Sequence, residues 1–486
     1  MHPPSVAATQ RAFLEMLNCP GMTAEDVAEW GARMARACLD SAEAVETAAP
    51  LLCGLALHSE PQLARAGVEG IFRHAAENMS DAFEPRLCDR YLQFFARVLW
   101  CCRAFPHAEW VDERLRRFGL RTEQDLTRRA RRLGRKPKRM PAEVRKIVVL
   151  SRVTLGADVA VTSVMLEKMM RVFPGAELVL LASPRAALLF AGQSRLATRP
   201  VEYPRDGGLL ERLGAWPLLV DRIEEELRGL KAGEYLVVDP DSRLTQLGML
   251  PAVADESSYI FFESRAYSQS KLQTLAEITA AWATERFGPD TTPLRPWVAF
   301  APEAIARAQA IRSACGGERL VSVNLGVGDN PAKRIEDPFE ERLLAALLDS
   351  GWRVFLDRGE GEEESSRIER LLSSLRKKGW KLAELEESCG LPDHTSQLVS
   401  WRGSLAGFGA LIGQSSLYIG YDSAGAHIAA ALGVKTIDIF AGFQWPRMPQ
   451  RWKPSGAGAV HLIVVDPHSP RDPEKILAQV WEAARW

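Results

Sequence analysis

The feature that most constrains the fold is a repeated order of buried strand, loop and helix that begins after Pro141. Residues 146–152 (KIVVLSR), 176–183 (AELVLLAS) and 234–242 (EYLVVDPDS) have the short apolar runs of buried strands, and residues 159–173 have a helical pattern. Strands that alternate with helices predict βαβ units and a parallel sheet, whose ligands bind at the carboxyl ends of the strands.

A second set of the same kind follows the loop-rich residues 285–297. Its expected strands are 319–326, 352–358, 416–421 and 435–440, and its last expected helix is 472–486. The acidic stretch GEGEEESS, residues 359–366, is interpreted as a solvated loop. The sequence therefore predicts an α/β protein with two Rossmann-like domains that face a cleft.

The first 133 residues have a helical pattern instead. Apolar side chains recur at spacings of three and four, as in Val27, Trp30, Met34 and Cys38, and Thr23 is a predicted N-cap. A second such series is Leu87, Tyr91, Phe94, Val98 and Cys102. We expect an all-helical domain at 1–140, without a visible catalytic constellation, followed by domains at 141–300 and 301–486.

Composition narrows the class of protein only moderately. The chain has 486 residues, 47% hydrophobic and 25% charged, with a formal net charge of −1, as in an ordinary soluble globular protein. No apolar run approaches the roughly 20 residues of a membrane span, and the N-terminus lacks a secretory signal pattern, so a cytoplasmic location is expected. Six cysteines in the first 102 residues lack metal-ligand spacing and are interpreted as buried free thiols: Cys19, Cys38, Cys53, Cys88, Cys101 and Cys102.

Residues 114–139 form a strongly basic segment. Twelve arginines and lysines there face only Glu113, Glu123 and Asp125 in the local sequence. One interpretation is a solvated helix face and linker; the other is a contact surface for an anionic partner, such as acidic lipid headgroups at the inner face of the membrane or a phosphorylated glycan. Nucleic acid is disfavoured, because Phe118 is the sole aromatic residue in the segment on which bases could stack.

Residues 420–442 (GYDSAGAHIAAALGVKTIDIFAG) place polar and small residues where a strand passes into a helix. Small residues let a turn come close to a ligand, and free N–H groups at a helix start attract an anion. Asp422 could accept hydrogen bonds from sugar hydroxyls, and His427 could donate one to a phosphate oxygen. The alternative is that Asp422 and Ser423 only cap the helix and that His427 is a half-buried structural histidine.

Two further loops follow predicted strands. NLGVGDNPAKR places Gly326 and Gly328 before Lys333 and Arg334, so a lysine could neutralise a diphosphate there, or could simply be an exposed loop residue.

LSRVTLGADVAVTS places Arg152, Gly156 and Asp158 between the first strand of the first set and its helix. Asp158 could cap that helix, or could serve as a general base at the carboxyl edge of the sheet.

These three stretches together resemble glycosyltransferase family 9, the heptosyltransferase-like enzymes of the GT-B fold, over residues 145–465. The resemblance rests on the loop, helix and turn of 155–183, on the glycine and lysine loop of 324–334, and on the Asp-Ser and His signature within 404–442. The helical residues before 140 have no counterpart in it. Ala157 separates Gly156 from Asp158, where the family has Gly-Asp, and Ala424 replaces a common glycine.

The resemblance implies an inverting, metal-independent transfer of a sugar from a nucleotide-diphosphate donor, often ADP-heptose, to a hydroxyl of a glycan, lipid-linked or protein acceptor. Asp158 would be the base, with Arg152 and Gly156 on the acceptor or phosphate side. The donor residues would be Gly326, Lys333, Arg334, Asp422, Ser423, Gly425, Ala426 and His427. No metal or other cofactor is implied.

Other classes fit the sequence less well. DPDSR, at 239–243, contains an Asp-x-Asp pattern, but two carboxylates alone form a weak metal site, and polar residues after a strand explain it. The dinucleotide and P-loop fingerprints are missing. A non-catalytic nucleotide-sugar-binding or scaffold protein, whose helical domain recruits a partner, is the main alternative to an enzyme.

Overall fold

The computed structural model describes residues 23–105, 107–133, 143–267, 273–316, 319–328, 330–359, 361–388 and 390–485. The chain forms two compact units, Met1–Ser151 with Arg199–Ser268, and Arg152–Thr198 with Gln269–Trp486. Each unit is described by itself below, and the expected domain boundaries at 140 and 300 stay a prediction. Among the described residues no helix is long and apolar enough to cross a membrane.

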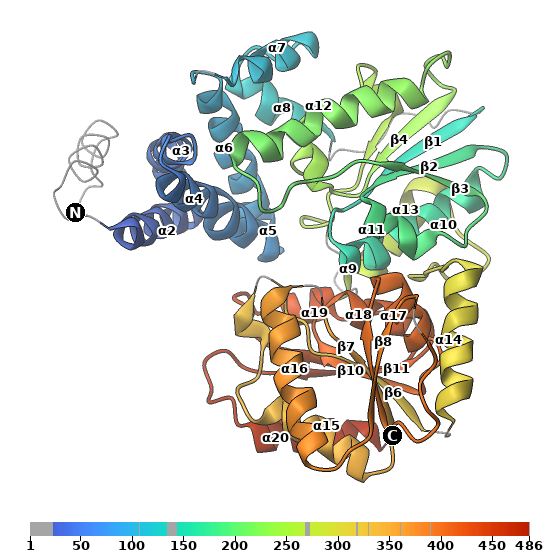
Figure 1. Cartoon of the computed structure of the whole chain (residues 1–486). Helices are drawn as coiled ribbons and strands as arrows, with labels where there is room; N and C mark the ends of the chain where they lie inside the picture. The colour runs from blue at the N-terminus through green and yellow to red at the C-terminus, as the bar shows by residue number, and fades with distance from the viewer. Residues whose placement is uncertain are drawn as a thin grey trace. The chain divides into compact units, whose positions relative to one another are not determined.

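The first unit begins with helices, as the three- and four-residue spacing predicts (Figure 1). They are α2 (Ala24–Asp40), α3 (Ala42–Ala56), α4 (Pro61–Glu69), the π-helix η1 (Gly70–Glu77), α5 (Asn78–Asp81), α6 (Pro85–Cys102), α7 (Glu109–Arg117) and α8 (Glu123–Leu133). Thr23 caps α2 in a capping box with Asp26, which confirms the predicted N-cap. The predicted apolar series of α6 is buried along its whole length, from Leu87 to Cys102. Cys38, Cys53, Cys88 and Cys102 are buried free thiols, Cys101 is a partly buried one, and Cys19 lies outside the described residues.

The rest of the first unit is α/β. It holds β1 (Lys146–Leu150), α12 (Leu209–Glu226), β4 (Tyr235–Asp239), η4 (Arg243–Thr245), η5 (Glu256–Ser258) and β5 (Tyr259–Phe261). β4 pairs in parallel with β1 and with β5. The five-stranded sheet has the order β3-β2-β1-β4-β5, where β3 is Leu196–Pro200 and β2 is Glu177–Ala182.

The second unit contains the remaining elements, which follow the predicted alternation. Before β3 these are α9 (Leu155–Ala157), the π-helix η2 (Asp158–Thr162), α10 (Ser163–Val172), α11 (Pro184–Ala187) and η3 (Leu188–Phe190). Later come α13 (Leu275–Phe287), α14 (Pro302–Cys315), β6 (Leu320–Asn324), η6 (Pro331–Lys333), α15 (Phe339–Asp349), β7 (Arg353–Asp357), α16 (Glu362–Lys377), β8 (Leu382–Glu386) and β9 (Leu398–Arg402). The chain ends with α17 (Leu405–Ile412), β10 (Leu417–Tyr421), α18 (Ala424–Ala431), β11 (Lys435–Phe440), α19 (Met448–Trp452), β12 (Val460–Val464) and α20 (Pro473–Ala484).

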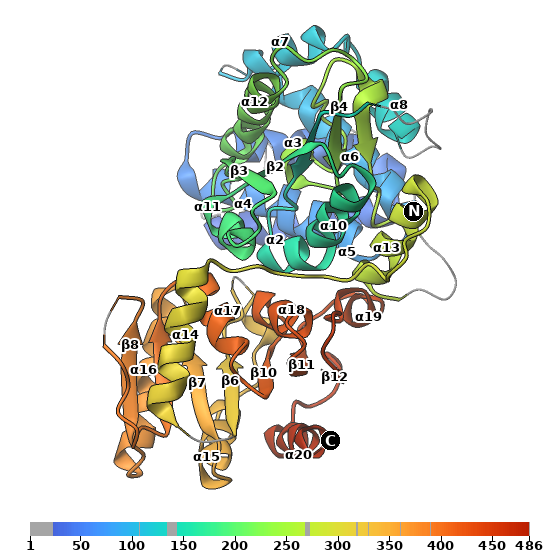
Figure 2. The same cartoon turned by 90° about the vertical axis from the view of Figure 1, so that its right-hand side faces the viewer.

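Strands β6 to β12, all in the second unit, form a parallel sheet in the order β12-β11-β10-β6-β7-β9-β8, and Figure 2 shows β7, β6, β10, β11 and β12 in that sequence. Helices α14 and α16 lie on opposite faces of the sheet in both views (Figures 1 and 2). The interpretation of 359–366 as a solvated loop was wrong in part, because residues 362–366 form the first turns of α16. Three glutamates in its first turn favour the helix by their interaction with the helix dipole.

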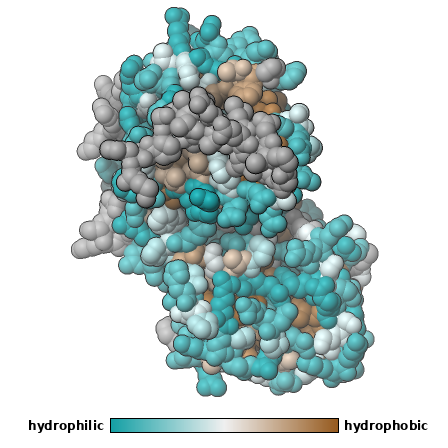
Figure 3. All heavy atoms as spheres, turned by 90° about the vertical axis from the view of Figure 1, so that its left-hand side faces the viewer, coloured by the Kyte–Doolittle hydropathy of each residue, from teal (hydrophilic) through white to brown (hydrophobic). Residues whose placement is uncertain are grey.

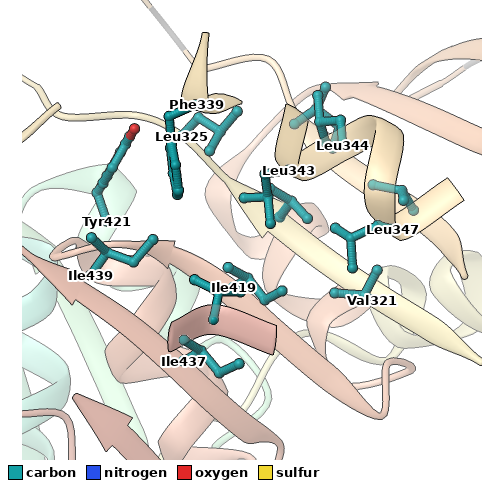
Figure 4. Packing of buried hydrophobic residues seen from close by; sticks show 14 of the residues in the cluster. Val321, Leu325, Phe339, Leu343, Leu344, Leu347, Ile419, Tyr421, Ile437 and Ile439 are labelled. Carbon is teal, nitrogen blue, oxygen red and sulfur yellow. The ribbon is translucent and has the colours of Figure 1, made fainter. Parts of the chain in front are cut away.

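One hydrophobic core of the seven-stranded sheet lies on the face that α15 covers. There α15 packs against alternate residues of β6, β10 and β11, as Figure 4 shows for Leu343, Leu347, Ile419 and Ile437. The opposite face of the same strands is more polar, and its buried residues include Ser322, Asn324, Thr436 and Asp438. The molecular surface drawn in Figure 3 is mostly hydrophilic, with small separate apolar patches.

Candidate functional site

The predicted helix start after β10 is present, and α18 begins at Ala424. Ser423 occupies the N-cap position but makes no side-chain capping bond, so the expectation that this side chain caps the helix is not met. Its hydroxyl lies 3.4 Å from the Tyr418 hydroxyl instead. Ala426 and Gly425 are buried in the first turn.

Gly420 and Gly425 are needed for packing around Tyr418. A Cβ atom added to Gly425 would lie 2.4 Å from the Tyr418 hydroxyl, and one added to Gly420 would lie 2.6 Å from it. Tyr418 is completely buried. The small residues that suggested room for a ligand therefore first make room for this tyrosine.

Lys333 and Asp422, predicted separately as donor-binding residues, form one ion pair. The Lys333 Nζ lies 2.5 Å from Asp422 Oδ2 and 3.1 Å from the Asp422 backbone oxygen. Lys333 ends the short helix η6, whose cap is Asn330, and its side chain is 25% exposed. The pair is thus partly solvent-accessible, so an incoming anion could draw the ammonium away from the carboxylate.

His427 lies in the first turn of α18 and is almost fully buried. Burial lowers the pKa of His427 to about 4, with Lys333 contributing to the decrease and Asp422 opposing it. Its ring meets the Trp452 ring edge-on at 6.3 Å between centroids. At neutral pH it is therefore an uncharged imidazole that can donate one hydrogen bond.

The loop of the predicted base packs against this helix start. A Cβ atom at Gly156 would lie 3.0 Å from the His427 ring and 3.6 Å from the Ala424 Cα, so the absence of a side chain at Gly156 permits the close approach. The loop 152–158 and the first turn of α18, which are about 270 residues apart in sequence, therefore lie side by side within the second unit.

Asp158 begins the π-helix η2 and is fully buried. Its Oδ1 accepts hydrogen bonds from the Arg152 backbone N–H and the Thr162 hydroxyl, both at 2.7 Å. The capping role, one of the two predicted alternatives, is not met, because Thr154 and Ala157 occupy the N-cap positions of α9 and η2 and Asp158 lies inside the helical segment. The base role stays a prediction. Arg152 is itself 4% exposed.

The glycine loop after β6 is organised by two of the chain's own side chains. Asn324 Oδ1 accepts from the Gly326 N–H at 2.9 Å, and Glu364 Oε1 accepts from Val327 and Gly328 N–H at 2.8 and 3.1 Å. Glu364 was missed because its stretch was read as a loop. Its position in the first turn of a helix after β7 was the available signal.

Arg334 does not join Lys333. Its Nε lies 3.1 Å from Glu340 Oε1, and it also pairs with Asp337. Glu340 is fully buried and also accepts a hydrogen bond from the Tyr421 hydroxyl at 3.1 Å. The structure thus places Arg334 in an ion-pair network beside β10.

Asp438 is a further residue that the sequence interpretation missed. It is a fully buried carboxyl on β11, and its signal was a lone acidic residue within the apolar stretch KTIDIF. Among the described residues, no group of three or more His, Cys, Asp or Glu side chains is arranged to hold a metal ion.

The two aspartates of DPDSR are structural. Asp239 is buried and accepts hydrogen bonds from the Ser242 N–H, the Thr245 hydroxyl and the Tyr259 hydroxyl. Asp241 pairs with Arg265 and accepts a hydrogen bond from the Ser264 hydroxyl. This confirms that polar residues after a strand explain the pattern.

The described part of the basic segment pairs with acids distant in sequence. The pairs are Arg114 with Asp221, Arg117 with Glu224, Arg129 and Arg132 with Glu256, and Arg131 with Asp89. Counting charge along the local sequence could not find these partners, which come from α12, η5 and α6. Residues 134–139 lie outside the described residues, and contact with an anionic surface stays a prediction.

Comparison with known proteins identifies a family domain in part of the chain. Residues 252–477 match the model of glycosyltransferase family 9 (heptosyltransferase). The chain carries a glycosyltransferase family 9 domain. The predicted resemblance and the predicted enzyme class, a glycosyltransferase, are thereby confirmed.

Solved structures of similar proteins bear on the fold. A glycosyl transferase family 9 structure from Veillonella parvula DSM 2008 is 14% identical with a TM-score of 0.52, over 72% of this chain and 98% of that one. The E. coli heptosyltransferase WaaC with ADP is also 14% identical, with a TM-score of 0.47, over 70% and 99% of the two chains. The first likeness supports the α/β GT-B fold for the two parallel sheets. A search of curated protein sequences found no match.

Proposed function

We propose that this family 9 enzyme transfers a sugar from a nucleotide-diphosphate donor to an acceptor hydroxyl with inversion at the anomeric carbon and without a metal ion. The observation that carries the proposal is the contact of Gly156 with His427, which brings the loop of Asp158 to the helix start that lies beside Lys333 and Asp422. The description of the family model as heptosyltransferase favours a heptose donor such as ADP-heptose.

In the proposed reaction, Lys333 leaves Asp422 and contacts the donor diphosphate. The N–H groups of the first turn of α18 face the same anion, since the side chain of Ser423 at the N-cap does not bond to them. When the bond between the anomeric carbon and the diphosphate oxygen breaks, negative charge grows on the leaving group. The ammonium and the helix start stabilise that charge more in the transition state than in the ground state.

Asp158 is proposed to take the proton of the acceptor hydroxyl. The hydroxyl oxygen then bonds to the anomeric carbon on the side opposite to the leaving diphosphate. The carboxylate is buried and bonded to Arg152 and Thr162 in the present structure. The reaction therefore requires the loop 152–158 to open toward the acceptor. The acceptor itself is proposed as a glycan, lipid-linked or protein hydroxyl.

Two substitutions separate binding from transfer. Asp158→Asn keeps the size and the hydrogen-bond acceptor of the side chain, so it should bind the donor as the parent does and lose transfer. Lys333→Ala should weaken donor affinity about 10- to 100-fold, because a hydrogen bond to a charged group contributes about 1.5–3 kcal/mol.

Calorimetry with nucleotide sugars and a radiolabelled transfer assay provide the two measurements. Lys377→Ala is the matched control, since it removes one exposed lysine at the far end of α16 from the strand ends of the site. An Asp158→Asn enzyme with unchanged turnover would contradict the base assignment. If the parent protein neither binds a donor nor transfers a sugar, a scaffold role would be favoured instead.

A further inference from the structure

Asp438 has no role in the fold that its surroundings explain. It lies on β11 among Thr436, Ile437 and Ile439, it is 0% exposed, and neither of its carboxyl oxygens has a hydrogen-bond partner among the described residues. A buried polar group left without a partner lowers stability. A residue that lowers stability on a buried strand suggests a functional reason for its presence.

The strand register places Asp438 beside the strand end that leads to Asp422. Asp438 is paired with Gly420 of β10, and the Asp422 N–H donates to the Ile439 carbonyl at 3.2 Å. Since side chains alternate along a strand, Asp438 shares a sheet face with Tyr418 and with the turn that carries Asp422. The space beside Gly420 holds the hydroxyl of Tyr418.

Burial and two neighbouring charges determine whether Asp438 is ionised. Burial raises the pKa of Asp438 well above its usual range, the Asp422 carboxylate adds to the increase, and Lys333 opposes it. His427 is uncharged at neutral pH because burial lowers its pKa. With Asp438 protonated, the ammonium of Lys333 faces one carboxylate, whereas an ionised Asp438 would give it two.

The other groups around Asp438 do not change this balance. The pKa of the Tyr418 phenol is raised by burial, so that side chain stays neutral. On the opposite side of β11 the residue in register with Asp438 is Leu462 of β12, which has no charge. The acidic Asp357 of β7 acts on Tyr418 and also raises its pKa.

We infer that Asp438 is a positioning residue of the donor site: held as an uncharged acid, it adds no negative charge beside the pair of Lys333 and Asp422, so the lysine can transfer from Asp422 to a diphosphate. Loss of its proton to the solvent adds a second negative charge beside Lys333 and weakens diphosphate binding. The inference rests on the proposed donor role of Lys333. It extends that role by naming a residue that controls it.

The test measures nucleoside diphosphate affinity against pH. Calorimetry with ADP, GDP and UDP identifies the tightest binder for the parent protein, and its Kd is followed from mildly acidic to alkaline pH. We expect the Kd to rise by up to about tenfold per pH unit once Asp438 ionises. Asp438→Asn is isosteric with the protonated acid, so it should keep the neutral-pH Kd and lose the rise.

Two further variants serve as controls for this experiment. Asp438→Leu replaces the carboxyl with an apolar group of similar size and should also show no rise, even if its stability differs. Asp466→Asn removes an exposed carboxyl after β12 and should retain the full rise. The same pH dependence in the parent and in Asp438→Asn would overturn the inference.

A second readout does not depend on any donor. The infrared carbonyl band of a protonated carboxyl should be present in the ligand-free parent at neutral pH and lost in Asp438→Asn. Absence of the band from the parent would overturn the inference while leaving the proposed function intact. A band that is present, together with no binding of any of the three diphosphates, would overturn the proposed donor site and with it the positioning role.

Discussion

Gly425 offers a direct test of the packing at the start of α18. A methyl group added there would lie 2.4 Å from the hydroxyl of Tyr418, closer than a Cβ atom approaches a non-bonded atom in a folded protein. Tyr418 is completely buried and lies between Gly420 and Gly425, so it has no free space into which to move. Overpacking of this kind costs about 1–3 kcal/mol of unfolding free energy.

The matched control is Gly214→Ala in α12. Gly214 is also helical, but a Cβ atom there has no neighbour within 4 Å. Alanine favours a helix over glycine by up to about 1 kcal/mol, and both variants gain this term. The difference between them therefore isolates the contact with Tyr418.

Differential scanning calorimetry measures the outcome. In a domain of 150–250 residues, about 1 kcal/mol shifts the Tm by roughly 2–4 °C, so Gly425→Ala should unfold several degrees below the parent and Gly214→Ala should not. Adding Tyr418→Phe removes the hydroxyl that the methyl group meets and should recover much of the loss in a double-mutant cycle. Equal Tm values for the two alanine variants would refute the reasoning.

Two further predictions concern the first unit. Arg129 is 4% exposed, donates to the Gly248 and Met249 carbonyls and pairs with Glu256. Arg129→Met should therefore lower the unfolding free energy by about 3 kcal/mol in urea titrations. Arg128→Met removes a side chain that is 76% exposed and should change the unfolding free energy by less than about 0.5 kcal/mol. A similar loss in both would contradict the assignment of Arg129 to a buried ion pair. Burial raises the pKa of Asp239 to about 6, above its unfolded value, so its contribution to stability is present at acid pH and is lost as the pH rises through 6. Relative to Asp239→Asn, the parent should therefore lose about 3 kcal/mol between about pH 4 and pH 7, and parallel stability curves would disprove this.

Hydrophobic pattern predicted most of the fold. The strands at 146–152, 176–183, 234–242, 319–326 and 435–440 follow from short apolar runs, since both faces of a parallel strand are buried. Strands β3, β5, β8, β9 and β12 were missed. Of these, β3 and β8 carry exposed or partly exposed residues, as in LATRP and LAELE. Their pattern does not differ enough from that of a loop.

The candidate site was predicted less completely, for a physical reason. Sequence spacing identifies residues that follow strands, such as Lys333 and Asp422, but not that the two side chains pair. Arg334 stands next to Lys333 in sequence and yet contacts Glu340, because consecutive side chains point in different directions. Tertiary packing decides such partners, and the register that places Asp438 opposite Gly420 is equally invisible in one sequence.

The hydrogen bonds of Glu364 have a consequence for where an anion can settle. The Val327 and Gly328 N–H groups both donate to this carboxylate. A negatively charged group that approached these two amides would therefore be repelled by Glu364. Ser423, at the N-cap of α18, makes no side-chain capping bond. In the proposed donor site, the loop after β6 would therefore contact a phosphate through Lys333 and not through the Val327 and Gly328 amides, which Glu364 already occupies.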